Sequence, residues 1–281
     1  MPFTFAHPAA VVPVHRIAGR YTSLSALVIG SMVPDAPQFL PLWISREQSH
    51  SLGGTMWFCI PVGLVVYLVF HGLVKRPAVD LMPGAIRSKL AASCGWGHGR
   101  RDADWLVVAA SLWAGALTHL LWDCFTHQSG KGAWFFPGID SVVLAIGDYQ
   151  LRLYKALQYG STVVGMALLA WWSLQWLARQ ELETDAAPSP LSGRLRLLVL
   201  AVMVVVCIAV AGLVVGGATV NRLSVRSWRR AVVRVAVTGI ATFGACLVAY
   251  AAVWTLWDRK QKGRRRAAVT VEPATLEECE R

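Results

Sequence analysis

Residues 118–127 read THLLWDCFTH and carry three potential metal ligands at one spacing, His119, Asp123 and His127. An α-helix turns about 100° per residue, so a step of four residues moves a side chain only about 40° around the axis. The three side chains therefore share one helix face if the helix continues to His127. Imidazole and carboxylate groups suit zinc and other first-row divalent metals. The spacing predicts a metal-binding face, with His127 a neighbouring group instead if the helix ends at Thr126.

Three more residues of the same kind stand earlier in the chain. His7 in FAHPAA precedes a proline, and His50 in REQSHSLGG stands just before an apolar run. Asp35 in VPDAPQ lies between two prolines, which restrict the backbone and hold the carboxylate in a defined direction. Each residue has a plain alternative, an interfacial histidine or a turn aspartate. The metal hypothesis therefore predicts that the polar atoms of His50, His119 and Asp123 converge to within about 5 Å of a common point, as ligand distances near 2.0–2.2 Å require.

The segment that holds His119 and Asp123 is apolar enough to lie in a membrane. The chain has 281 residues, 55% hydrophobic and 15% charged, whereas soluble domains are about 45–50% apolar and about 25% charged. Apolar blocks of about 20 residues match a hydrocarbon core of about 30 Å. The expected spans are residues 55–74, 105–125, 161–178, 197–216 and 231–257, of which 161–178 is shorter and rich in tryptophan. An aspartate inside such a span needs a partner, because a buried unpaired charge is costly.

A shorter apolar run, LSALVIGSMV at residues 24–33, breaks at PDAPQFLP. It predicts a half-length or re-entrant helix packed against the spans. A signal peptide is the alternative, but MPFTFAHPAA has no early basic residue and no A-x-A-like cleavage site follows. The expected fold is an all-α, multi-pass membrane protein of about five spans plus this short amino-terminal helix. It forms one domain over residues 1–258, with the site within 1–130, anchoring helices over 197–257 and a disordered cytoplasmic tail over 259–281.

Five spans place all six candidate ligands at one membrane level. The connections 75–104 and 179–196, together with the tail, carry more Lys and Arg than the opposite side. The positive-inside rule therefore places them in the cytoplasm and the polar cluster on the outer side. The formal charge of +11 comes from clusters at helix ends, DRKQKGRRR from residue 258 among them, which suit membrane lipid headgroups and not nucleic acid. No Cys-x-x-Cys occurs, so no cysteine zinc site is expected.

Four stretches follow one another in the first half of the chain: MPFTFAHPAAVVP, LVIGSMVPDAPQFLP, SHSLGG and GALTHLLWDCFTH. Together they resemble a bacterial membrane family, domain-of-unknown-function family 4184, across most of the chain. That family is in turn similar to inner-membrane proteins regarded as metal-dependent hydrolases. The resemblance implies a polar cluster of His7, Asp35, His50, His119 and Asp123. Those hydrolases often show HRGxTHS, whereas SREQSHS here keeps only His50, one histidine fewer for a two-metal centre.

Three functions are open at this point. The leading hypothesis is a hydrolase that acts on a phosphoester or related bond of a lipid-like substrate, with one or two divalent ions, zinc foremost. Asp35 would serve as a ligand or as the general base. The rival is a transporter or assembly factor that uses the cluster for ion handling. An internal repeat with matched broken helices would distinguish it from the hydrolase. The region after residue 160 has no counterpart of THLLWDCFTH. In the third hypothesis, the cluster has a structural role and links the helices through hydrogen bonds.

Overall fold

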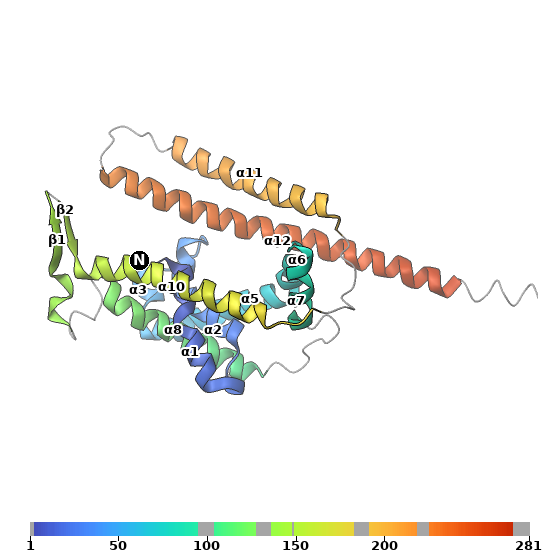
Figure 1. The fold of residues 1–281 in the computed structure, drawn as a ribbon, viewed down its shortest axis with the longest axis horizontal. Helices are drawn as coiled ribbons and strands as arrows, with labels where there is room; N and C mark the ends of the chain where they lie inside the picture. Colours follow the sequence, from blue (N-terminus) through green and yellow to red (C-terminus); the bar gives the residue numbers. More distant parts are fainter. Residues whose placement is uncertain are drawn as a thin grey trace, which may run out of the picture. The chain divides into compact units, whose positions relative to one another are not determined.

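A computed structural model of the protein describes residues 3–94, 104–127, 136–147, 149–182, 191–217 and 225–271. Within these residues, five helices are long and apolar enough to cross a membrane (Figure 1). They are Leu52–Asp80, Trp105–Thr126, Leu153–Ala178, Gly193–Val214 and Ala231–Arg264. The predicted all-α, multi-pass fold with five spans is confirmed. The contiguous apolar length predicted each span, and the structure lengthens several of them by a turn or more.

Contacts divide the chain into two compact units, Met1–Leu68 with Gly97–Glu181 and Val69–Trp96 with Leu182–Arg281. The predicted single domain over residues 1–258 includes residues of both units and stays a prediction. The first unit contains η1 (Thr4–Ala6), α1 (Pro8–Ala18), η2 (Gly19–Tyr21), α2 (Leu24–Gly30), η3 (Val33–Gln38), α3 (Arg46–Ser49), α4 (Leu52–Gly54), η4 (Thr55–Cys59), most of α5 (Ile60–Val69), α8 (Trp105–Thr126), η6 (Pro137–Asp140), β1 (Val142–Ile146), β2 (Tyr149–Arg152) and α10 (Leu153–Ala178). The second contains η5 (Phe70–Val74), α6 (Lys75–Asp80), α7 (Gly84–Cys94), α11 (Gly193–Gly217) and α12 (Val225–Val271).

The short helix α2 packs against the span α8 backbone to backbone, because glycines lie where the two helices approach. A Cβ on Gly115 would lie 2.3 Å from the carbonyl oxygen of Leu27, and one on Gly30 would lie 2.1 Å from that of Leu112. Leu27 and Leu112 are themselves fully buried. The predicted half-length helix is therefore α2, held against a span as expected. Since Gly115 and His119 are one turn apart on α8, this contact also sets the position of His119 against the end of α2.

The connection after α8 contains a two-stranded hairpin that the sequence analysis did not predict. Strand β1 pairs antiparallel with β2, with Ile146 opposite Tyr149. Gly147 follows β1 with a positive φ of 56°, which suits glycine in a tight turn. Two residues separate the apolar run VVLAI from YQLR, and the first is this glycine. That pattern is a hairpin signal that could have been found from the sequence.

In the second unit, α12 continues through the basic stretch to Val271, which corrects the disordered tail predicted from residue 259. Arg, Lys, Gln and Ala are good helix formers, and a helix that already exists extends without a new nucleation cost. Lys262 Nζ lies 2.7 Å from Asp258 Oδ2, one turn earlier, and this pair supports the extension. The rest of the predicted tail, residues 272–281, lies outside the described residues.

A buried carboxylate ties α6 to α12 within the second unit. Asp80 is fully buried at the end of α6, and Trp254 Nε1 donates a hydrogen bond to its Oδ2 at 3.0 Å. One turn earlier on α12, the Tyr250 hydroxyl donates to the carbonyl oxygen of Pro77 at 3.4 Å. The sequence predicted packing and anchorage for the helices after residue 197 but did not identify this polar contact. It gives α12 a specific attachment within its unit.

We predict that Gly115→Ala destabilises the protein by about 1–3 kcal/mol, because the added methyl group forces α2 away from α8. The matched control is Gly160→Ala on α10, where nothing lies within 4 Å of an added Cβ. There alanine should be neutral or stabilising by up to about 1 kcal/mol, since it favours a helix over glycine. Thermal unfolding of the purified protein in detergent measures both. A Gly115→Ala protein that melts at or above the wild-type temperature would show that the fold does not need this close contact.

Candidate metal centre

Asp35 is held by the proline-flanked 3₁₀-helix η3 and is fully buried. Thr4 Oγ1 donates to its Oδ2 and Gln38 Nε2 donates to its Oδ1, both at 2.7 Å. Burial alone would raise the pKa of Asp35, but the positive charge that His50 and His119 carry when protonated, together with the hydrogen bond from Thr4, outweighs it and holds the pKa below its ordinary range. The carboxylate is therefore ionised at neutral pH. Its orientation by outer hydrogen bonds is typical of carboxylates that bind metals.

His119 and His50 have their protons fixed by backbone carbonyls. The Nδ1 atom of His119 lies 2.7 Å from the carbonyl oxygen of Ser31, just after α2. The Nδ1 atom of His50 lies 3.0 Å from the carbonyl oxygen of Arg46, one turn earlier in the chain. A carbonyl oxygen only accepts hydrogen bonds, so Nδ1 of His119 carries a proton. His50 Nδ1 also lies 3.0 Å from Ser49 Oγ, but that hydroxyl donates to the Arg46 carbonyl at 3.1 Å, which favours a proton on Nδ1 of His50 as well. Each neutral ring then presents the lone pair of Nε2, which is the form of histidine that binds a metal.

The short helix α3 positions His50. Its first turn is closed by a capping box, in which Ser45 Oγ accepts from the Gln48 backbone and the Gln48 side chain accepts from the Ser45 backbone. His50 follows as the residue that ends the helix. Its ring approaches the ring of His119 edge-on, with centroids 5.2 Å apart. Histidines from α8 and from the end of α3 thus reach one place.

Two imidazole nitrogens and two carboxylate oxygens alternate around a common point. We call these four residues the ligand ring: Asp35, His50, His119 and Asp123. His50 Nε2 lies 3.3 Å from Asp35 Oδ1 and 3.5 Å from Asp123 Oδ2. His119 Nε2 lies 3.8 Å from Asp35 Oδ1 and 3.7 Å from Asp123 Oδ2. Among the described residues, both Nε2 atoms are buried without a hydrogen-bond partner. The convergence expected for His50, His119 and Asp123 is therefore observed.

The distances in the ligand ring distinguish a shared metal ion from shared protons. A charge-assisted N–H···O bond would bring its two heavy atoms to about 2.7–2.9 Å. Atoms that each lie about 2.0–2.2 Å from one divalent ion are about 2.8–3.6 Å apart in tetrahedral or octahedral geometry. The observed separations of 3.3–3.8 Å lie within or just beyond the second range. The residues present therefore fit a divalent cation bound by nitrogen and oxygen.

His7 offers a fifth donor beside the ligand ring. Its ring stacks on that of His119 with centroids 3.8 Å apart, and its Nε2 lies 3.8 Å from Asp123 Oδ1. Neither ring nitrogen of His7 has a hydrogen-bond partner within the part of the chain that the structure describes. Burial, together with the neighbouring His119, lowers the pKa of His7 to about 3. At neutral pH His7 is therefore an uncharged imidazole that can bind a metal.

His127 lies beside Asp123 but not among the converging ligand atoms. Helix α8 ends at Thr126 and His127 is extended, with φ −129° and ψ 141°. Its Nδ1 lies 3.4 Å from Asp123 Oδ1, and its Nε2 lies 3.3 Å from Arg46 Nη2. Burial lowers the pKa of His127 to about 4, so it is neutral at pH 7. Among the described residues, two groups of three have ligand atoms that all lie within 4.8 Å of one another. One group is His7, His119 and Asp123, the other is Asp35, His50 and His119, and His127 belongs to neither.

Arg46 is a charged side chain at the site that the sequence analysis did not single out. Its Nη2 donates to Asp123 Oδ2 at 2.8 Å. The signal was present in SREQSHS, because an arginine one helical turn before a candidate histidine can reach the same site. The carbonyl of Ser31 and the side chains of Thr4 and Gln38 were also missed, and they become identifiable only when the chain has folded.

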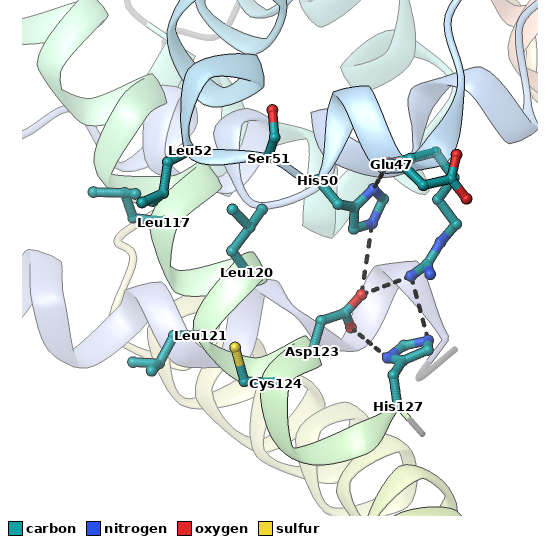
Figure 2. Close-up of a pocket in the computed structure, with 11 residues that line it drawn as sticks. Glu47, His50, Ser51, Leu52, Leu117, Leu120, Leu121, Asp123, Cys124 and His127 are labelled. Carbon is teal, nitrogen blue, oxygen red and sulfur yellow. Dashed lines mark hydrogen bonds and ion pairs between the residues drawn. The ribbon is translucent and has the colours of Figure 1, made fainter. Parts of the chain in front are cut away.

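A pocket of about 720 Å³ opens beside the ligand ring (Figure 2). His50 and Asp123 line it, together with Arg46 and His127. His7, Asp35 and His119 are not among its lining residues. The ring therefore presents one His–Asp edge to the pocket, and the other three donors lie behind that edge.

The fold and the site define a multi-pass helical membrane protein with a buried histidine and aspartate cluster near one end of its spans. The chain belongs to the family described as a domain of unknown function, DUF4184, whose sequence model matches residues 1–252. The resemblance drawn from the four motifs is therefore confirmed, while the wider similarity to metal-dependent hydrolases stays a prediction. No curated protein and no solved structure matches the chain.

We predict that Asp35→Asn lowers the metal content of the purified protein at least tenfold, because it replaces an ionised donor of the ring by a neutral amide. Asp140→Asn is the matched control, since Asp140 pairs with Arg152 away from the ring. Elemental analysis after size-exclusion chromatography gives the metal-to-protein ratio of each monodisperse sample. A full complement of metal in Asp35→Asn would exclude Asp35 as a ligand.

Proposed function

We propose that the protein is a membrane-embedded, metal-dependent hydrolase that acts on a phosphoester or related bond of a lipid-like substrate. The observation that carries the proposal is the ligand ring, in which nitrogen and oxygen lone pairs face one another beside an open pocket. Such a donor set suits zinc and the other first-row divalent ions. When bound, the ion would supply Lewis-acid activation of water and of the bond to be broken.

The described residues have separable roles in this proposal. His50, His119 and Asp123 bind the ion through the atoms that face the ring centre, and His7 can complete the set. Asp35 is better suited to bind the ion than to act as the general base of the sequence hypothesis. It has no exposed surface, and both of its oxygens already accept hydrogen bonds. Its low pKa also makes it a poor proton acceptor.

Access to the ring supports a reaction at its pocket edge. Only His50 and Asp123 of the ring line the pocket, so a substrate in the pocket reaches the ion from that side. Hydrolysis there adds water across a phosphorus–oxygen bond, with the hydroxyl group transferred to phosphorus and the proton to the departing alcohol. The three donors that do not line the pocket, His7, Asp35 and His119, would hold the ion while substrate and product exchange on the pocket side.

The proposed location is a cell membrane, with the ligand ring on the outer side and the carboxyl terminus in the cytoplasm. The support is the larger number of Lys and Arg residues in the connections on the opposite side of the membrane from the ring. The basic part of α12, which includes residues 259–264, would then contact anionic headgroups of the inner leaflet.

Metal removal tests the proposal. We predict that the purified protein hydrolyses a generic phosphomonoester such as p-nitrophenyl phosphate, that chelation lowers the rate at least a hundredfold, and that zinc or manganese restores it. His50→Ala should lose the activity because it removes a donor of the ring at the pocket edge. His15→Ala is the control, since His15 bonds Thr22 away from the ring.

Two results would contradict the proposal. One is hydrolysis that persists after elemental analysis shows the metal to be gone. The other is a protein that retains a stoichiometric ion but hydrolyses none of a panel of soluble and lipid phosphoesters. The second result would instead favour a transporter or assembly factor that uses the same donors without catalysis.

A further inference from the structure

The pocket beside the ligand ring has two chemically different ends (Figure 2). Leu52, Leu117, Leu120 and Leu121 gather at one end. His50, Asp123 and His127 lie at the other, and the carboxylate of Asp123 points toward the two imidazoles. A binding site for a small hydrophilic phosphoester has no need of four leucines. A pocket with one apolar and one polar end matches a molecule with the same division.

The leucine end lies on the exposed surface of two helices that are long and apolar enough to span a membrane. Leu52 is 68% exposed and Leu121 is 63% exposed, and each belongs to a helix that is apolar and long enough to span. Leu52 begins its span, and Leu121 lies close to the end of the next, so both are near the same bilayer surface. Exposed leucines on spanning helices contact lipid chains. In a membrane, a molecule dissolved in the lipid could therefore reach the pocket from the side.

The polar end favours a negatively charged group. Arg46 uses Nη2 to reach Asp123, and 38% of its side chain remains exposed where it lines the pocket. A guanidinium carries five N–H donors in a planar fork, which suits phosphate oxygens. Arg46 and a divalent ion together outweigh the carboxylates of Asp35 and Asp123 by one positive charge. Glu47 at the rim is exposed to water, where its charge is screened.

We propose that the pocket binds an amphiphile with a phosphate head and an alkyl chain. The head lies between Arg46 and the pocket edge of the ligand ring, and the chain lies along Leu117, Leu120 and Leu121. The molecule enters from the lipid side, with its head at the level of the membrane surface. This inference rests on the proposed function for the positive charge of the ion, and it names the substrate class of that same site.

Photocrosslinking of the full-length, metal-loaded protein tests the inference without relying on turnover. The probe is hexadecyl phosphate with a diazirine in the middle of its chain, and mass spectrometry maps the labelled peptides. We expect labelling within residues 117–124 at least tenfold above that of the lipid-facing leucines of α10. Unlabelled hexadecyl phosphate should compete, whereas hexadecanol and inorganic phosphate should compete at least a hundredfold more weakly.

Two variants test the two ends of the pocket separately. Leu120→Trp should lower the labelling at least fivefold, because the indole fills the space for the chain. Arg46→Gln should lower it at least tenfold, because the amide carries no charge for the head. Leu168→Trp is the matched control on α10, where Leu168 is 51% exposed away from the pocket, and it should leave the labelling unchanged.

The outcomes separate this inference from the proposed function. Labelling spread evenly over the lipid-facing helices, or insensitive to both pocket variants, would overturn the amphiphile site. Hydrolysis of soluble phosphoesters together with such even labelling would leave the hydrolase proposal standing alone. Specific labelling of residues 117–124 by a protein that hydrolyses no ester would retain the amphiphile site and end the hydrolase proposal.

Discussion

The mutual repulsion of four electron-rich atoms is the constraint on which the first unit depends. The ring of Asp35, His50, His119 and Asp123 brings them to 3.3–3.8 Å without a hydrogen bond between neighbours. Backbone carbonyls hold the Nδ1 protons of both histidines away from the centre, so lone pairs face lone pairs. An aspartate within a span already costs about 2.5–3.5 kcal/mol on insertion scales. In the proposed metal centre, a divalent cation would convert the arrangement from a source of instability into a link between three segments of the chain, which are η3, the end of α3 and α8.

The local structure around the ring can be understood as the means of holding these atoms in place. Glycines at the crossing of α2 and α8 let the two backbones touch, which brings the carbonyl of Ser31 to His119. Prolines restrict η3 while Thr4 and Gln38 orient Asp35. A capping box closes the four-residue helix that ends at His50. Each device is short and acts through the backbone or through a few hydrogen bonds, so the fold itself sets the ligand geometry.

The sequence predicted the spans and most of the candidate ligands, and it failed where the answer depends on distant contacts. Apolar length alone identifies a span, and a four-residue step places His119 and Asp123 on one face without knowledge of the rest of the chain. The tautomer of His119 depends on Ser31, 88 residues away, and the role of Arg46 depends on Asp123, 77 residues away. No local pattern contains either pair. Whether His127 can reach the ring depends on where α8 ends, and the sequence left both alternatives for His127 open. The hairpin after α8 and the helical extension to Val271 are different, because local signals for both were present and were missed.

The most direct measurement is X-ray absorption spectroscopy at the zinc edge, on the full-length protein purified in detergent and loaded with one equivalent of zinc. The account predicts a first shell of nitrogen and oxygen alone at about 2.0–2.2 Å, with the outer-shell scattering of at least two imidazoles. His119→Ala should lower the imidazole contribution or release the metal. A first shell that contains sulfur at about 2.3 Å, or zinc that dissociates from the wild-type protein on dilution, would contradict the account.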